Sequence, residues 1–278
     1  MLRHYTLLSA VMALQLVLIS SPRIPALAAN LVQLWPNPAE VNTTKLAAST
    51  IAKLNSYDLV LLLDSSGSMN DKDCPAQANN ENFRLSKEHN SNDCLTRWQW
   101  CAQELSDFDK QAKGVLSEPL RVASFAKKTH DYSGLTFSTV SQVFYFTSPK
   151  GNTDTTAAMK AELADYLEKK TKGEHQKPLL LAVISDCCPD NKISVKETLK
   201  KLSQTTNPKE ICVVFLQIGN DKNGNRFLEQ LNEEVSKGRI RADLLRTVSF
   251  SQILEGGVAK ALIDVAHSQE ELATSDAP

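Results

Sequence analysis

The chain has 278 residues, of which 42% are hydrophobic and 23% charged, and its formal net charge is −1. This composition is typical of a folded globular protein and is long enough for one large domain. The near-zero charge excludes the strongly basic proteins that bind nucleic acids through an electrostatic surface, so we expect no nucleic-acid partner.

The first 28 residues have the pattern of a secretory signal peptide. A basic residue, Arg3, precedes an apolar run from Leu7 to Ile19, and Ala26-Leu27-Ala28 supplies a cleavage site with small residues. The run is too short for a comfortable transmembrane helix. We expect a mature chain that begins at Ala29 and has no transmembrane segment; an uncleaved anchor is the alternative. The expected location is the periplasm, the thylakoid lumen or the cell exterior.

The domain begins with a short apolar run. Residues 29–55 form a lead-in without evident chemistry. Leu59–Leu63 are then uniformly apolar and end in an acid, Asp64. Such a run predicts a central parallel strand that is buried on both faces. The following segment, residues 70–96, is a polar insert. It leaves directly from the turn after this strand, so we expect it to lie over that turn.

The rest of the chain alternates apolar runs with amphipathic segments. Further strands are predicted at residues 120–125, 129–132, 179–184, 211–218 and 244–248. Helices are predicted at residues 97–114, 155–172, 195–204, 227–237 and 251–267, with a short amphipathic segment at 138–146. This alternation predicts an α/β fold over residues 56–267, with a doubly wound, mostly parallel sheet flanked by helices. Residues 268–278 are predicted to be a flexible tail.

The cysteines predict disulfide bonds. All six follow the signal peptide, and an even number in an exported chain favours bridges. Cys74 and Cys94 flank the insert, so we expect a disulfide to hold it. The candidates for bridging are Cys74, Cys94, Cys101, Cys187 and Cys188. Cys212 lies inside an apolar strand and is expected to be a buried thiol. Neither the cysteine spacing nor the scattered histidines resemble a zinc site.

Three turns offer oxygen ligands. Asp64, Ser66 and Ser68 follow the first strand, Asp186 follows the run at 179–184, and Thr153 lies in a turn that contains glycine. Taken alone, the first turn is more readily a structural Gly/Ser turn. If the strands are parallel, however, the turns share one edge of the sheet. Oxygen-only ligation suits a hard divalent cation, with Mg²⁺ expected and Mn²⁺ and Ca²⁺ as alternatives.

The combination resembles the von Willebrand factor A (vWA) domain, in the form exported by bacteria, with a complete metal ion-dependent adhesion site. That motif is Asp-x-Ser-x-Ser, a Thr in a Gly-rich turn and an Asp after the fourth strand. The five matching positions are Asp64, Ser66, Ser68, Thr153 and Asp186. Two neighbours depart from the family's usual glycines, namely Asn152 and Cys187. The insert is also longer than in typical members, which puts the partner in doubt more than the metal.

The resemblance implies a role for each residue. Ser66 and Ser68 bind the metal directly, and Thr153 binds it when a partner is engaged. Asp64 and Asp186 act mainly through waters. An open coordination position then accepts an Asp or Glu side chain from a partner protein.

The expected function is therefore a non-enzymatic, metal-dependent protein-interaction module for adhesion or assembly. Two alternatives remain open. The first is a metal-dependent hydrolase, for which Asp190 is a candidate base, although the sequence contains no Gly-x-Ser-x-Gly elbow and no zinc-protease motif. The second is a thiol/disulfide redox protein that uses Cys187 and Cys188.

Overall fold

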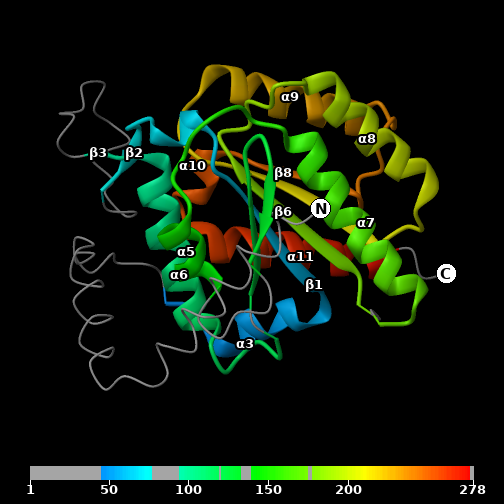
Figure 1. Cartoon of the computed structure of the whole chain (residues 1–278). Coiled ribbons are helices and arrows are strands. Elements are labelled where there is room, and N and C mark those ends of the chain that lie inside the picture. Colours follow the sequence, from blue (N-terminus) through cyan, green and yellow to red (C-terminus); the bar gives the residue numbers. More distant parts are fainter. Residues whose placement is uncertain (1–44, 77–93, 119, 133–138, 175–176, 276–278) are drawn as a thin grey trace, which may run out of the picture. The chain divides into compact units, whose positions relative to one another are not determined.

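Six strands form one sheet in the described part of the chain, and the central ones are apolar. In the computed structural model, which describes residues 45–76, 94–118, 120–132, 139–174 and 177–275, the strand order is β5-β4-β1-β6-β7-β8 (Figure 1). The strands are β1 (Asp58–Asp64), β4 (Arg121–Phe125), β5 (Thr129–Asp131), β6 (Leu179–Ser185), β7 (Ile211–Gln217) and β8 (Leu245–Val248). Every neighbouring pair is parallel except β4 and β5, which are antiparallel. The predicted α/β fold with a mostly parallel sheet is confirmed.

Helices cover both faces of the sheet. One face carries α3 (Ala48–Ile51), the 3₁₀ helix η1 (Ala52–Ser56), α5 (Arg97–Ala112), α6 (Thr139–Phe146), α10 (Phe250–Ile253) and α11 (Gly257–Ser275). The other face carries α7 (Thr155–Thr171), α8 (Lys192–Thr205) and α9 (Lys222–Ser236). Each face therefore has its own hydrophobic core.

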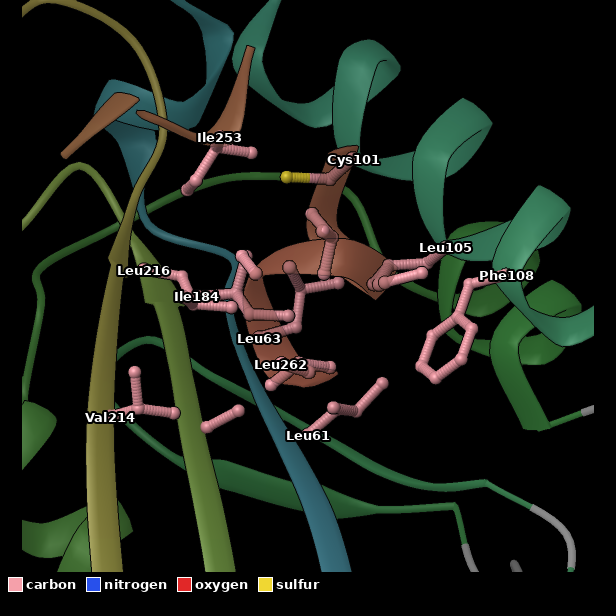
Figure 2. Close-up of a cluster of buried hydrophobic side chains, with 14 of the residues drawn as sticks. Leu61, Leu63, Cys101, Leu105, Phe108, Ile184, Val214, Leu216, Ile253 and Leu262 are labelled. Carbon is pink, nitrogen blue, oxygen red and sulfur yellow. The ribbon is translucent and has the colours of Figure 1, made fainter. Parts of the chain in front are cut away.

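The central strand supplies side chains to both cores. Leu61 and Leu63 point into the core beneath α5, α10 and α11, which Figure 2 shows. Val60 and Leu62 point into the core beneath α7, α8 and α9. This alternation follows from the period of two along a strand and explains why the run contains no polar residue.

The strand order reverses between β1 and β6. The chain moves outward through β1, β4 and β5 and then returns to place β6 on the other side of β1. In doubly wound sheets, ligands bind at the carboxyl ends of the strands beside this reversal. The crevice between β1 and β6 is therefore where a site is expected.

The ends of the polar insert meet in a small hairpin. After β1 a 3₁₀ helix, η2 (Gly67–Asn70), leads to β2 (Cys74–Pro75), which pairs antiparallel with β3 (Cys94–Leu95). The register pairs Cys74 with Leu95 and Pro75 with Cys94. The body of the insert, and with it the prediction that it lies over the site, falls outside the described residues, as does the signal peptide.

The C-terminal region differs from the sequence prediction. Instead of one helix over 251–267, α10 ends at Ile253 and α11 runs from Gly257 to Ser275. The break coincides with Gly257, whose φ is +80°. None of the helices in the described ranges combines the length and the apolarity that a membrane crossing requires.

Candidate metal centre

Two buried carboxyl groups lie where the strand order reverses. Asp64 is the last residue of β1, and Asp186 directly follows β6. Their exposed fractions are 0% and 1%. The hydroxyl of Ser185 joins them, because it donates to Asp64 Oδ2 at 2.6 Å and lies 3.4 Å from Asp186 Oδ1. Two acids that are 122 positions apart in sequence, from 64 to 186, thus share one crevice.

The turn after β1 places two hydroxyl groups side by side. The backbone N–H of Ser66 donates to Asp64 Oδ1 at 2.7 Å, which fixes the start of the turn. The Oγ atoms of Ser66 and Ser68 are 3.1 Å apart. Adjacent ligands of an octahedral Mg²⁺ with bonds of about 2.1 Å are separated by about 3.0 Å. The hydroxyl pair therefore has the spacing of two neighbouring ligands.

Backbone hydrogen bonds hold the turn that contains Thr153 against the other two. Gly67 N donates to Gly151 O at 3.0 Å. Gly151 has φ +83°, a conformation that suits glycine. Thr153 N donates to Asp190 Oδ2 at 3.1 Å, and Asp190 N returns a bond to Thr153 O at 3.1 Å. The three predicted turns are thus linked to one another, and Asp190 orients the Thr153 loop.

A fourth element supplies a residue that is not among the predicted ligands. Arg97, the first residue of α5, is only 3% exposed. Its Nη1 donates to Asp186 Oδ2 at 3.0 Å and to the carbonyl of Ser68 at 3.3 Å. Its Nε and Nη2 donate to the two oxygens of Asp73, at 3.0 and 2.7 Å. The guanidinium group therefore fixes one oxygen of Asp186 and joins the metal centre to the base of the insert.

Helical spacing could have identified Arg97. It lies four residues before Cys101 and eight before Leu105, on the face of α5 that packs against the sheet. A guanidinium on such a face needs a buried acidic partner, because an unpaired charge is costly to bury. The sequence therefore indicated that Arg97 needs an acidic partner, although it did not identify that partner.

The electrostatics of the crevice favour a cation. Burial raises the pKa of the Asp64 carboxyl to about 7, and the nearby charge of Asp186 adds to this, although hydrogen bonds from Ser185 and Ser66 oppose it. Within the described ranges Asp64 forms no ion pair. Burial alone would lower the pKa of Arg97, but its carboxylate partners raise the pKa above its usual value, so this charge persists. A bound cation would compensate Asp64 directly.

The structure does not contain the predicted disulfide. No two of the six cysteines are joined in a disulfide bond. Antiparallel pairing of β2 with β3, rather than a bond between Cys74 and Cys94, holds the ends of the insert together. Cys101, Cys187 and Cys212 are buried among apolar side chains, so the expectation for Cys212 is confirmed. Cys187 has φ +61°, which accounts for the glycine that the resemblance leads one to expect there.

The donor set suits a hard cation only if the hydroxyl groups take part. In the part of the chain that the structure describes, no three His, Cys, Asp and Glu residues group closely enough to hold a metal. The crevice instead offers two carboxyl groups and the hydroxyls of Ser66 and Ser68, and the turn that contains Thr153 is joined to it through the bond from Gly67 N to Gly151 O. An all-oxygen set of this kind fits Mg²⁺ or Mn²⁺ better than zinc or copper.

Comparison with known proteins finds similarity at the level of solved structures. No protein-family model and no curated protein matches the sequence. The chain resembles the manganese-loaded TRAP protein of Plasmodium vivax, with 18% identity, a TM-score of 0.44, and coverage of 75% of this chain and 72% of that one. It resembles a mutant PilB minor pilin from Streptococcus sanguinis, with 10% identity, a TM-score of 0.48 and coverage of 79% and 63%.

A third similar structure is an aerotolerance-related membrane protein from Bacteroides fragilis NCTC 9343 with multiple mutations to serines. It has 16% identity, a TM-score of 0.45, and coverage of 76% of this chain and 98% of that one. The chain spans less than two thirds of the pilin, 63% of its length. Likenesses at this level do not indicate what the present chain binds, so its function has to follow from the chemistry of its own site.

Proposed function

We propose that the protein is a non-enzymatic interaction module of the vWA type that binds a partner protein through a divalent cation. The observation that carries the proposal is the hydroxyl pair of Ser66 and Ser68, 3.1 Å apart, beside the buried carboxyl of Asp64. Such a shell combines ligand spacing with an unbalanced negative charge. Mg²⁺ is the expected ion, with Mn²⁺ and Ca²⁺ as alternatives.

Each residue has a distinct role in this proposal. Ser66 and Ser68 would hold the ion directly, and Thr153 would join them when a partner is engaged. Asp64 and Asp186 would orient the hydroxyls and the ion's waters. Because most direct ligands are neutral hydroxyls, the ion keeps a strong attraction for an incoming carboxylate. The partner is therefore expected to offer an Asp or Glu side chain.

Arg97 adds a feature to this site. Its guanidinium group pairs with Asp71 and Asp73 as well as with Asp186, at 3.5, 2.7 and 3.0 Å, so its charge is shared among three carboxylates. It therefore offsets part of the negative charge near Asp186 that an incoming carboxylate would otherwise meet.

The two alternative functions have weaker support. A hydrolase needs a base near the ion, but Asp190 already accepts a hydrogen bond from Thr153 N. A redox function needs a reactive thiolate. Burial and the charge of Asp186 raise the pKa of both Cys187 and Cys188, which keeps both thiols protonated. Export, with removal of residues 1–28, is part of the proposal and rests on the signal-peptide pattern alone.

Calorimetric titration of the full chain with Mg²⁺ and Mn²⁺ tests the site. Asp64→Asn keeps the shape of the side chain but removes its charge, and we expect affinity to fall by about 10- to 100-fold. Thr153→Ala deletes one neutral ligand, so ion affinity should fall less than about tenfold. In a pull-down with Mg²⁺, Thr153→Ala should reduce the amount of a carboxylate-bearing partner that is retained by a larger factor than it reduces ion affinity.

Asp58→Asn is the matched control. Asp58 is the first residue of β1, and Asp64 is the last, so Asp58 lies at the end of the strand away from the crevice. It is 5% exposed and pairs with Arg121. Its substitution should leave ion affinity unchanged even if it lowers stability. The proposal is wrong if the wild-type chain binds neither ion at millimolar concentration, or if it retains its partners fully in EDTA.

A further inference from the structure

Among the residues that the structure describes, β8 is an edge strand that pairs only with β7. Val213 N donates to Leu244 O at 2.7 Å, and the register pairs Arg246 with Val214. In a parallel ladder, alternate residues face the neighbouring strand, so Arg246 and Val248 face β7. The N–H and C=O groups of Leu245 and Thr247 consequently point away from β7, in the direction where a further strand would lie.

A groove of about 580 Å³ runs along this edge, within the range of about 300–1,000 Å³ that is typical of ligand sites. Its walls come from opposite faces of the sheet. Helix α9 packs on one core through Phe227 and Leu231, and α10 packs on the other through Phe250 and Ile253. The groove therefore follows the strand edge itself and is flanked by a helix on each side.

Two amide side chains line the groove with their acceptor ends already occupied. Asn232 Oδ1 on α9 accepts from Thr247 Oγ1 at 2.8 Å. Gln252 Oε1 on α10 accepts from the N–H of Ser249 at 2.8 Å and from its hydroxyl at 2.9 Å. In the described part of the chain, the NH₂ groups of both amides form no hydrogen bond. One donor therefore remains on each wall.

From this arrangement we propose that the groove binds an extended peptide segment, which adds to the sheet beside β8. The outward N–H and C=O groups of Leu245 and Thr247 match the alternating groups of a peptide backbone, and the amide NH₂ groups can donate to its carbonyls. The ionisable lining residues are Glu229 and Arg246, of opposite charge. The groove therefore favours an uncharged backbone over a phosphate or another strongly charged ligand.

A single strand is a simpler occupant of this edge than a second copy of this chain. A second copy that paired through its own β8 would bring its α9 and α10 against the same two walls. A peptide strand needs only the space along the edge. The proposal does not depend on the metal centre, so it can be tested in EDTA.

The test uses 12-residue peptides selected from a random phage-displayed library against the full chain in EDTA. Affinities of the selected peptides are measured by fluorescence anisotropy. We expect N-methylation of alternate peptide amides to weaken binding by about tenfold or more, because each blocked amide loses a backbone hydrogen bond and meets a steric clash. N-methylation of the intervening amides should have less than about a twofold effect.

Two tryptophan variants of α9 provide the matched comparison. Asn232→Trp fills the groove, whereas Glu233→Trp introduces the same side chain at the next residue, which is exposed and lies outside the groove. We expect the first to weaken peptide binding by more than about tenfold and the second by less than about twofold. The proposal fails if no peptide is selected, if N-methylation has no periodic effect, if both variants behave alike, or if the groove is filled by a second copy, seen as a concentration-dependent dimer that Asn232→Trp abolishes.

Discussion

Gly219 shows how closely the residues around Arg97 are packed. It has φ +79°, and a Cβ at this position would lie 2.3 Å from Arg97 Nε and 2.6 Å from Asp73 Oδ1. Gly238 has a similar φ of +66°, but no atom lies within 4 Å of its Cβ position. Both positions demand the left-handed conformation, and only Gly219 also demands the absence of a side chain.

Substitutions at these two glycines separate the cost of backbone strain from the stability that the contacts of Arg97 contribute. We expect Gly238→Ala to lower the free energy of unfolding by about 1 kcal/mol, which is the left-handed penalty. Gly219→Ala must also displace the buried guanidinium of Arg97 from its contact with the half-buried Asp73, and should cost about 3 kcal/mol or more. Urea denaturation of both variants measures the difference. Equal losses of stability in the two variants would mean that Arg97 and Asp73 can shift to admit the methyl group without weakening the fold.

At the scale of elements, α11 begins over a buried acid on α5. Glu104 is 5% exposed, and its Oε2 accepts from Val258 N at 3.2 Å. Its Oε1 has no hydrogen-bond partner among the residues described. Burial raises the pKa of this carboxyl to about 7, which the bond from Val258 opposes and the charge of Asp107 reinforces. The ordinary value is 4.5.

Stability should consequently depend on the ionisation of Glu104. Below pH 4.5 both the folded and the unfolded chain hold the proton, so burial of the neutral acid is not penalised. Between pH 4.5 and about 7 the unfolded chain releases the proton more readily, so stability falls as the pH rises. The full effect is roughly 3 kcal/mol. In urea unfolding curves, Glu104→Gln should reduce the slope of stability against pH in this window, where Asp64, whose pKa is also about 7, keeps a contribution of its own. Glu229→Gln, at an exposed position, should leave the slope unchanged. Parallel curves for wild type and Glu104→Gln would contradict the assignment.

Glu104 also lies at an element boundary that the sequence prediction missed. Apolar periodicity continues across residues 251–267 and predicts one helix, although the consecutive glycines Gly256 and Gly257 are a local signal for a break. What could not be predicted locally is the close packing there, since a Cβ on Gly257 would lie 2.5 Å from Oε2 of Glu104, 153 positions earlier on α5. The apolar strands, by contrast, are set by local sequence and were predicted to within a residue or two.

The same division holds for the whole molecule. The convergence of Asp64 and Asp186 could be predicted, because parallel strands end at one edge and both acids follow apolar runs. The ion pair between Arg97 and Asp73 could not be predicted, because the polar insert separates the two residues in the sequence. The groove beside β8 could not be predicted either, since it depends on how two helices flank an edge strand. The position of the crevice can therefore be predicted from local sequence patterns and the sheet topology. Its electrostatics cannot, because they depend on contacts between residues that are distant in the sequence.

The insert provides the last prediction at this scale. Pro75 and Cys94 are paired in an antiparallel hairpin, so the two ends of the segment already lie side by side. Replacing residues 76–93 with Asn-Gly should close the hairpin with a two-residue turn. Because a shorter loop costs less entropy to close, the variant should be more stable by about 1–2 kcal/mol in urea unfolding.

Metal affinity should be unchanged in this variant, because Asp73 and Arg97 lie outside the replaced segment and keep their contact with Asp186. Partner binding in Mg²⁺ provides the informative contrast. If it is lost while ion affinity stays the same, the insert contributes to recognition of the partner. A variant that no longer folds would contradict the prediction. The replaced segment would then have to make contacts that folding requires, beyond those of the hairpin and of the Arg97–Asp73 ion pair.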